Sequence, residues 1–469
     1  MSKTDTIAAI ATGMSSGGIS IIRISGDEAI KIADSVYRSK NGKKKLIEQA
    51  SHTVHYGYIC DGELIVDEVI VVIMKGPHSY TREDVVEINC HGGMLVTRKI
   101  LETVMKYGAR MAEPGEFTKR AFLNGRIDLS QAEAVIDVIN AKNQYALESS
   151  LQQLKGSVKD TIKKIRESIL HDTAFIEAAL DDPEHISVEG FSETLLQRVN
   201  GNIKELQDLL QSADNGRILK EGVKTVILGK PNAGKSSLLN ALLGEERAIV
   251  TDVEGTTRDT LEETIQFGPV MLQLMDTAGI RETQDVVEQI GVQKARNSAN
   301  QADLLLYLVD ASRPLDDNDT QIMEFLKEKM DQSKVIILLN KQDLKQVVTK
   351  DALAEKLEVI TKHSCKMIPI SAKNEKGMEL LETEVKNMFY QGNVTFNDQV
   401  FITNLRHKEA IIEGLESLEQ VKESIACHMP EDFYSIDLMQ AYESLGRIIG
   451  ESVEEDLVNK IFKEFCMGK

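Results

Sequence analysis

The sequence predicts a multidomain chain with an N-terminal α+β domain, a helical domain, and an α/β domain inserted into the helical one. Three observations lead to this prediction. In the middle of the chain, apolar strand patterns each end in a short polar motif; helical periodicity lies on both sides of them; and alternating strand patterns fill residues 1–120. The chain has 469 residues, which is too long for one hydrophobic core and is consistent with about three domains.

The central motif is GKPNAGKS at residues 229–236. A buried-strand pattern at 223–228 precedes it, and a helix-like run at 237–243 follows it. This order aims backbone N–H groups and a helix N-terminus at a phosphate chain. We expect Lys235 to neutralise phosphate oxygens and the Ser236 hydroxyl to bind Mg²⁺. The motif therefore predicts a P-loop.

Two further segments are expected near the phosphates. The motif DTAG at 276–279 follows the apolar strand pattern 270–275, so its Asp can hold Mg²⁺ through water and its Gly can sense the γ-phosphate. The polar loop 251–259 lies between the two motifs and is suited to a switch segment. Within it, Thr257 is the candidate for a second hydroxyl on Mg²⁺.

The next two motifs indicate which base is bound. NKQD at 340–343 ends the strand pattern 335–339, and the Asp343 carboxylate can accept hydrogen bonds from both N1 and N2 of guanine. Adenine offers no such donor pair. SAK at 371–373 follows the strand pattern 367–370 and is expected to complete the base pocket through backbone N–H groups.

Five motifs in this order, mostly at strand ends where an open α/β sheet binds its ligand, predict a GTP-binding, Ras-like P-loop domain and hence a GTPase. The expected GTP-binding residues are Asn232, Ala233, Gly234, Lys235, Ser236, Ser237, Thr251, Thr256, Thr257, Asp276, Thr277, Ala278, Gly279, Asn340, Lys341, Asp343, Ser371, Ala372 and Lys373.

The usual hydrolytic glutamine is missing. Ras-like GTPases place a Gln directly after the D-x-x-G motif to orient the attacking water, whereas this chain has Ile280 there. An acidic residue farther along can substitute, and the candidates are Glu282, Asp285 and Glu288, each of which also fits a solvated loop. An arginine finger at Arg258 or Arg281 is not compelling. A monovalent cation would supply the same positive charge, and Asn232 offers a side-chain carbonyl for it.

Composition limits the choice of partners. The formal net charge is −19, so the surface as a whole is not a general polyanion-binding one. The short basic clusters at 40–45 and 159–166 are more simply solvated loop or helix faces. Five scattered cysteines show neither a C-x-x-C pair nor metal-ligand spacing. Without a signal peptide or long apolar span, a reduced, cytoplasmic protein is expected.

Residues 1–120 are expected to form a compact α+β domain. A strand pattern occupies 19–24, and strands at 52–60 and 63–74 flank Asp61-Gly62, a strong hairpin signal. A further strand at 85–90 leads through His91-Gly92-Gly93 to a helix ending near Gly108. The glycine pair fits an anion site, but a tight turn is the simpler interpretation.

Helical periodicity dominates the remainder of the chain. Apolar residues recur at helical spacing between Pro114 and Pro183, and the pattern resumes near Leu206. Residues 400–426 and 433–465 are helical again. One helical domain with an inserted α/β domain explains both blocks, because neither block alone promises a complete core. Two separate small bundles are the alternative.

Several motifs together resemble one family. They are the P-loop, TDVEGTTRD at 251–259, DTAGIRE at 276–282 and the terminal FCMGK at 465–469. Shorter N-terminal matches extend the likeness over the whole chain: DTI at 5–7, RISG at 23–26, HGG at 91–93, PGEF at 114–117 and RAFLN at 120–124. The chain resembles the bacterial and organellar tRNA uridine-5-carboxymethylaminomethyl modification GTPases.

The resemblance implies a domain plan and several ligands. It implies a tetrahydrofolate-binding and dimerisation domain at 1–120, a first helical part at 121–219, an inserted GTPase domain at 220–381, and a second helical part at 382–469 with its terminal Cys-Met-Gly-Lys. Family members bind a 5-formyl-tetrahydrofolate-type one-carbon donor; the corresponding residues here are Arg23, Glu87, Arg126 and Lys469. Arg126 stands where some members carry Lys, which keeps the charge but alters its geometry.

The resemblance also implies how GTP is hydrolysed and used. The GTPase domains of a homodimer approach one another in a K⁺-dependent manner, with K⁺ ligands at Asn232, Thr251, Val253 and Thr256. Glu288 matches the acid that orients water in the family. With an FAD-dependent partner, members add an aminomethyl-type group to C5 of the wobble uridine of certain tRNAs.

Cys466 invites a nucleophile hypothesis, because a thiolate could attack C6 of a pyrimidine and activate C5. A packing cysteine beside Phe465 is the simpler alternative. Met467 replaces an Ile that is common in the family's terminal motif, and both are apolar. A GTP-regulated ribosome-assembly factor of the Era-like kind remains the competing function. Such factors tend to carry a basic RNA-binding module, whereas this acidic chain has the N-terminal domain and the Cys-Met-Gly-Lys terminus instead.

Overall fold

The computed structural model describes residues 5–13, 15–186, 190–244, 263–268, 270–275, 300–330, 333–361, 365–389, 402–451, 455–463, 465 and 468. The chain divides into two compact units. One contains Met1–Ile139, Leu151–Lys204 and Glu409–Lys469, and the other contains Asn140–Ser150 and Glu205–Lys408. The first unit is therefore built from segments on both sides of the second, as the predicted insertion requires.

The N-terminal part of the first unit is a seven-stranded sheet within the described residues, with the order β3-β4-β5-β6-β2-β1-β7. Its strands are β1 (Ile7–Ile10), β2 (Ile19–Ser25), β3 (Tyr37–Ser39), β4 (Thr53–Asp61), β5 (Leu64–Met74), β6 (Val85–His91) and β7 (Arg110–Met111). The helices α1 (Ala29–Val36) and α2 (Met94–Lys106) and the short 3₁₀ helix η1 (Leu46–Glu48) belong to the same part. The β4–β5 hairpin confirms the turn predicted at Asp61-Gly62.

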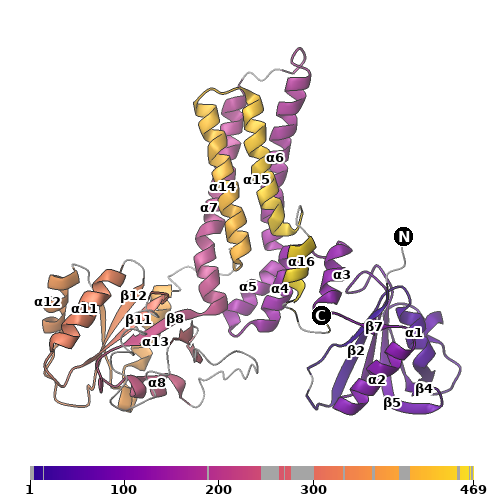
Figure 1. Ribbon diagram of the computed structural model, residues 1–469, viewed down its shortest axis with the longest axis horizontal. Coiled ribbons are helices and arrows are strands. Elements are labelled where there is room, and N and C mark those ends of the chain that lie inside the picture. Colours follow the sequence, from indigo (N-terminus) through magenta and orange to yellow (C-terminus); the bar gives the residue numbers. More distant parts are fainter. Residues whose placement is uncertain are drawn as a thin grey trace. The chain divides into compact units, whose positions relative to one another are not determined.

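The helices α1 and α2 pack on one face of this sheet (Figure 1). Alternating residues such as Ile22, Ile24 and Ile88 point into the core beneath them. Arg23 and Glu87 lie between these positions and therefore on the opposite face, because successive side chains of a strand alternate between faces. At the glycine pair, Gly92 hydrogen-bonds with the backbone of Gly17 and Gly18 at 3.0 Å and 3.4 Å, and a Cβ there would lie 2.4 Å from the Gly17 carbonyl oxygen; Gly93 is the N-cap of α2 in an extended conformation. The tight turn predicted here is therefore not what the structure shows.

The helical part of the chain surrounds the inserted unit in sequence. Its helices are α3 (Glu116–Leu123), α4 (Leu129–Asn140), α5 (Gln144–Lys155), α6 (Ser157–Asp181), α7 (Phe191–Glu221), α14 (Leu405–Ala426), α15 (Glu431–Ile449) and α16 (Glu455–Lys463). The helices α6 and α15 lie side by side (Figure 1). None of the helices in the described ranges is long and apolar enough to cross a membrane.

Segments before and after the insertion share a hydrophobic core. Ala121, Leu129 and Ala132 from the first block pack with Val458 and Phe462 of α16. This shared core favours one helical domain over two small bundles.

An ion pair between a buried arginine and an exposed glutamate also crosses between the two helical blocks. Arg166 on α6 is 4% exposed, pairs with Glu451, and stacks 3.9 Å from the ring centroid of Tyr442. The interpretation of 159–166 as a solvated basic face is therefore wrong at Arg166.

The second unit contains a six-stranded sheet among its described residues, with the order β13-β12-β11-β8-β10-β9. Its strands are β8 (Val223–Leu228), β9 (Glu263–Phe267), β10 (Val270–Leu274), β11 (Leu304–Asp310), β12 (Lys334–Asn340) and β13 (Lys366–Pro369). All neighbours pair in parallel except β9 and β10. The strands predicted at 223–228, 270–275, 335–339 and 367–370 are confirmed.

Helices cover both faces of this sheet. They are α8 (Lys235–Leu243), α11 (Asp317–Lys329), α12 (Lys350–Thr361) and α13 (Met378–Phe389), with the 3₁₀ helix η2 (Ala372–Asn374). On β11, Leu306 packs with α8 and α13, whereas Tyr307 packs with α11 and α12. Because Leu381 and Val385 of α13 share one core, we propose that the inserted domain extends to the end of α13, beyond residue 381.

Candidate nucleotide site and N-terminal basic cluster

The P-loop connects β8 to α8 along a tightly constrained path. Gly234 has φ of 104°, and a Cβ there would lie 2.2 Å from Nδ2 of Asn340. Only glycine combines this left-handed conformation with such a close approach. Asn232 has φ of 60°, a conformation that Asn tolerates better than most residues. The loop therefore presents its backbone at the N-terminus of α8, where anions bind.

Lys235 lies along the inner side of this loop. Its Nζ donates to the Gly229 carbonyl oxygen at 2.6 Å and to the Lys230 carbonyl oxygen at 3.3 Å. Burial lowers the pKa of Lys235, because desolvation disfavours the ammonium form. Lys235 is therefore positioned to bind an anionic ligand beside the P-loop.

Asn340 joins three motifs that the sequence presents separately. Its Nδ2 donates to the Ala233 carbonyl oxygen at 2.8 Å, and its Oδ1 accepts from the Ala372 backbone N–H at 2.9 Å. Asn340 is 3% exposed, so these bonds satisfy a buried amide. The NKQD and SAK loops are thereby fixed against the P-loop.

Asp343 lies at the solvent edge of the same group. Its Oδ1 accepts from the Ser371 hydroxyl at 2.7 Å. This hydrogen bond lowers the pKa of the exposed Asp343 carboxyl, so the group is ionised and acts as an acceptor at neutral pH. Lys341 turns away from it, with φ of 65° and its Nζ 2.6 Å from Oδ2 of Asp310.

Asp310 was missed by the sequence analysis. It is the last residue of β11, and an Asp at the end of an apolar strand was the signal that could have identified it. Burial alone would raise the pKa of Asp310, but hydrogen bonds from Lys341 and Ser312 lower it overall. The ionised carboxylate therefore holds Lys341 in place.

A second overlooked group ties the P-loop to α11. Nζ of Lys230 lies 2.6 Å from Oδ2 of Asp319 and 2.8 Å from Oδ2 of Asp316. The buried Tyr307 hydroxyl donates to Oδ1 of Asp319 at 2.9 Å. Asp316 and Asp319 also form the capping box of α11. The pattern Asp-x-x-Asp before an apolar helix was the available sequence signal.

Many expected site residues lie outside the described residues, and their roles stay predictions. They are Thr251, Val253, Thr256, Thr257, Asp276, Thr277, Ala278, Gly279, Ile280, Glu288, Cys466 and Lys469. The P-loop, NKQD and SAK residues are described, and the structure brings these three groups together.

The N-terminal candidates also come together, on the sheet face opposite α1 and α2. Arg23 on β2 is directly opposite Glu87 on β6, and its Nε donates to Glu87 Oε1 at 2.9 Å. Its guanidinium lies 5.3 Å from the ring centroid of Tyr80, and that of Arg126 lies 4.6 Å from the same centroid. The Gly468 carbonyl oxygen accepts from Nη1 of Arg23 at 3.4 Å, which places the chain's C-terminal end beside this basic cluster.

Tyr80 is the central residue that the sequence analysis did not identify. Its hydroxyl is 2.9 Å from Oγ1 of Thr118 on α3. The ring is held between strand and helix, with guanidinium groups close enough for cation–π attraction. No local motif marked it, because its importance depends on Arg23 and Arg126.

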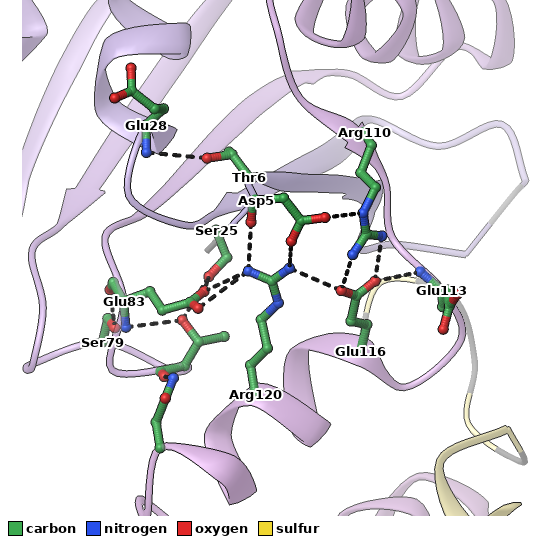
Figure 2. Close-up of polar contacts among 12 residues, drawn as sticks. Asp5, Thr6, Ser25, Glu28, Ser79, Glu83, Arg110, Glu113, Glu116 and Arg120 are labelled. Carbon is green, nitrogen blue, oxygen red and sulfur yellow. Dashed lines mark hydrogen bonds and ion pairs between the residues drawn. The ribbon is translucent and has the colours of Figure 1, made fainter. Parts of the chain in front are cut away.

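A network centred on Arg120 fixes the surrounding segments (Figure 2). Its Nη1 donates to the Asp5 carbonyl oxygen at 2.8 Å and to Glu83 Oε2 at 3.2 Å, and its Nη2 donates to Glu116 Oε1 at 3.0 Å. Arg110 also donates to Glu116, at 2.6 Å and 2.9 Å. Arg120 is 9% exposed; it joins the chain start, the β5–β6 loop and α3.

The sheet topology and joined motifs define the class: a P-loop GTPase domain carried on a helical domain with a separate N-terminal α+β domain. Two family profiles match the chain. The one described as "MnmE helical domain" matches residues 129–466, and the one described as "GTP-binding protein TrmE N-terminus" matches residues 6–126.

Curated relatives match over the whole length. A protein of Lachnoclostridium phytofermentans named tRNA modification GTPase MnmE is 60% identical over 467 residues, covering 100% of both chains. Proteins of the same name from Clostridioides difficile and Acetivibrio thermocellus are 47% and 48% identical, covering 99% and 100% of each chain. The chain belongs to the MnmE family of GTPases.

Two solved structures are similar to part of the chain. Era of Aquifex aeolicus bound to GDP·AlF₄⁻ is 32% identical, with a TM-score of 0.26, covering 42% of this chain and 66% of Era. Elongation factor SelB of Methanococcus maripaludis is 19% identical, with a TM-score of 0.26, covering 37% of this chain and 35% of SelB. The N-terminal and helical family matches favour the MnmE assignment over the Era-like alternative.

Proposed function

We propose that this chain is a K⁺-dependent GTPase that modifies tRNA. With an FAD-dependent partner protein, it adds a carboxymethylaminomethyl or aminomethyl group to C5 of the wobble uridine in certain tRNAs. The observation that carries this proposal is the whole-length relationship to tRNA modification GTPases at 60% identity. The basic N-terminal cluster supports it, because a GTP switch alone would not need this second site.

In the proposed GTP site, each described group has one task. The P-loop backbone and Lys235 bind the phosphates, Ser236 binds Mg²⁺, and Asp343 accepts from N1 and N2 of guanine. Asn340 positions both parts, since it bonds the P-loop and the SAK loop. Mg²⁺, when bound, neutralises charge that develops on the phosphate oxygens.

The proposed K⁺ would supply positive charge that no glutamine or arginine finger provides. Asn232 supports this proposal, because its side chain is exposed at the turn of the P-loop and carries a carbonyl oxygen. In the same proposal, Glu288 orients the attacking water. GTP turnover should be several-fold faster in K⁺ than in Na⁺ at equal ionic strength, and equal rates would exclude the role of K⁺.

Homodimerisation is proposed through exposed apolar side chains of β4 and β5, on the sheet face opposite α1 and α2. Val54 and Tyr56 on β4 are 64% and 50% exposed, and Ile70, paired with Tyr56 across the strands, is 44% exposed. Apolar side chains grouped on a sheet face favour burial against another surface. Tyr56→Glu should increase the monomer fraction in analytical ultracentrifugation, whereas an unchanged fraction would argue against this face.

The base pocket has its own test. Asp343→Asn removes an ionised acceptor for guanine N1 and N2, so GTP affinity should fall about 10- to 100-fold, as for a lost charge-assisted hydrogen bond. Xanthosine triphosphate should gain relative affinity, because the Asn amide can donate to its additional carbonyl. Competition binding measures the ratio, and an unchanged preference would contradict the assignment of Asp343.

The function itself is tested in cells. Mass spectrometry of tRNA nucleosides from a strain lacking the gene should show loss of the C5-modified wobble uridine. Wild-type protein should restore it, and Lys235→Ala should not. Full modification in the deletion strain would refute the proposed function.

A further inference from the structure

A cavity of about 590 Å³, wide open to the surface, lies beside the Arg23–Tyr80–Arg126 cluster, in the same unit of the chain. The side chains of His52, His78, Arg82 and Arg126 line it, together with Tyr80. All four nitrogen-bearing groups can donate hydrogen bonds. The cavity is far larger than a single water or inorganic ion needs, so its shape and chemistry suit an extended anion.

The carboxylates nearest in sequence to this cavity are engaged elsewhere. Glu83 accepts from Arg120 and, at 2.7 Å, from the Ser25 hydroxyl (Figure 2). Asp84 accepts from the Gly76 backbone N–H at 3.0 Å. No acidic side chain is among the residues that line the cavity in the described part of the chain. Its positive groups are therefore not neutralised from within the cavity wall.

Hydrogen bonds around the Arg120 network also fix the conformation of the cavity wall. Ser79 donates to the Glu83 carbonyl oxygen at 2.5 Å, and Oγ of Ser25 lies 2.7 Å from Oγ1 of the buried Thr81. Arg82 donates from Nη1 to the Asn124 carbonyl oxygen at 2.9 Å. These bonds fix the β5–β6 loop on both sides of Tyr80, so the cavity is formed before a ligand arrives.

Tyr80 and Arg126 belong both to this cavity and to the proposed folate site. Arg23 lies near the Tyr80 ring and is bonded to Glu87, whose carboxylate can accept N–H donors of a pterin ring. On the cavity wall, His52, His78 and Arg82 each carry a positive charge or can donate a hydrogen bond. Folate has the matching polarity, because its pterin end carries N–H donors and its other end carries glutamate carboxylates.

We propose that this cavity binds the glutamate tail of the folate one-carbon donor, and that the site prefers polyglutamylated folates. The inference rests on the proposal that this cluster binds the folate one-carbon donor implied by the family resemblance, and deepens it by naming the form of the ligand. Each added glutamate brings one carboxylate, and Arg82 and His78 lie where a tail passing Arg126 would meet donors.

The test is titration calorimetry with the full-length protein and two probes. These are 5-formyl-tetrahydrofolate with one glutamate and the same compound with several. At low salt the polyglutamate form should bind about five- to twentyfold more tightly, as expected for added charge-assisted contacts. Its advantage should shrink as salt rises, because exposed charges are screened.

Two variants and one matched control assign the preference to the cavity. Arg82→Gln removes one guanidinium, and His78→Glu adds a repelling charge where no side-chain hydrogen bond is described for His78. Both should reduce the preference to less than about twofold while the monoglutamate still binds. Arg98→Gln removes an equal charge from α2, where Arg98 is 78% exposed, and should leave the preference unchanged.

The outcomes separate the two levels of the proposal. Equal affinity for the two folates, or a preference that persists in both variants, would overturn the tail assignment and leave the folate site intact. Failure of both forms to bind would remove the folate site and the tail assignment together. If Arg82→Gln weakens tRNA binding but leaves the folate ratio unchanged, the cavity serves RNA phosphates and the inference is wrong.

Discussion

The nucleotide site and the N-terminal basic cluster are assembled differently. Around the P-loop, each contributing motif is continuous in sequence and sits at the end of a strand, and backbone groups provide much of the surface. In the N-terminal cluster, single side chains come from β2, β6, the β5–β6 loop and the turn before α4. Arg23 and Glu87 meet only because β2 pairs with β6 in that register.

The two sites therefore differ in the mutations that should disrupt them. A backbone-lined loop tolerates changes around it, provided that its glycines and its lysine remain. A site made from separate side chains depends on the sheet register and on the Arg120 network that holds the β5–β6 loop. If the two sites are independent in binding, a mutation in one should leave the ligand of the other bound normally.

The largest effect is expected at the P-loop. Lys235→Ala removes the cation that would contact the phosphates, so GTP turnover should fall about 10²- to 10³-fold, as for loss of a transition-state contact. Single-turnover hydrolysis measures the loss. Folate binding by calorimetry is the internal control, and a parallel loss of folate affinity would show that the two sites are coupled.

A smaller effect, on folate affinity, is expected at the N-terminal cluster. Arg23→Ala leaves Glu87 without its partner and removes a donor beside Tyr80, so 5-formyl-tetrahydrofolate affinity should fall about 30-fold or more. GTP binding should be unchanged. Arg98→Ala is the matched control on the same domain, and normal folate binding by Arg23→Ala would exclude Arg23 from the site.

Lys230→Met tests whether the stability of the inserted domain depends on the ion pairs of Lys230 with Asp316 and Asp319. Asp319 would lose its ammonium partner while buried, so the inserted domain should lose about 1–3 kcal/mol of stability, allowing for screening at the lysine. Thermal denaturation with and without GTP measures it, and GTP should restore part of the loss. Lys327→Met on α11 is the control, and equal melting temperatures for both variants would show that the network contributes no stability.

The smallest effect is a pH dependence of the Arg120 network. A hydrogen bond from Arg110 lowers the pKa of Asp5, and hydrogen bonds from Arg110 and Arg120 outweigh burial to lower that of Glu116. A carboxyl group whose pKa is lowered by folding stabilises the fold at any pH above its unfolded pKa, which is 3.8 for Asp5 and 4.5 for Glu116. This contribution to the free energy of unfolding is lost as the pH falls.

Hydrogen exchange at α3 should therefore accelerate below about pH 4.5 more than exchange at α8, after correction for intrinsic rates. Glu116→Gln should exchange faster at neutral pH and respond less to acid. An identical pH response in the variant would show that this carboxylate does not carry the effect.

Local sequence was sufficient for much of the inserted domain. The run 335–339 is continuously apolar, as is typical of a parallel strand covered on both faces. The Asp-Gly turn between β4 and β5 was equally clear. The predicted helix after the P-loop began two residues late, at Ser237 instead of Lys235, because Gly234 in its left-handed conformation ends the loop.

Other features had only a partial local signal, as at Asp310 and Asp319, or none, as at Tyr80. Tyr80, Asp310 and the Lys230–Asp319 pair each depend on residues distant in the chain, and so does the burial of Arg166. A charged residue in a polar stretch has the same sequence appearance whether it is solvated or paired. Only packing decides which of them loses water and gains a partner.

The motifs alone predicted a guanine-nucleotide site made from a P-loop and an NKxD segment, because those short segments carry their geometry in their own backbone. The sequence also predicted the order of the domains through the period of its apolar residues. Only the folded structure shows that Asn340 joins three motifs, that Arg23, Glu87, Tyr80 and Arg126 lie in one cluster, and that a cavity lined by basic side chains adjoins it. These contacts are set by strand register and by the folding of distant segments onto one another, which no local pattern encodes.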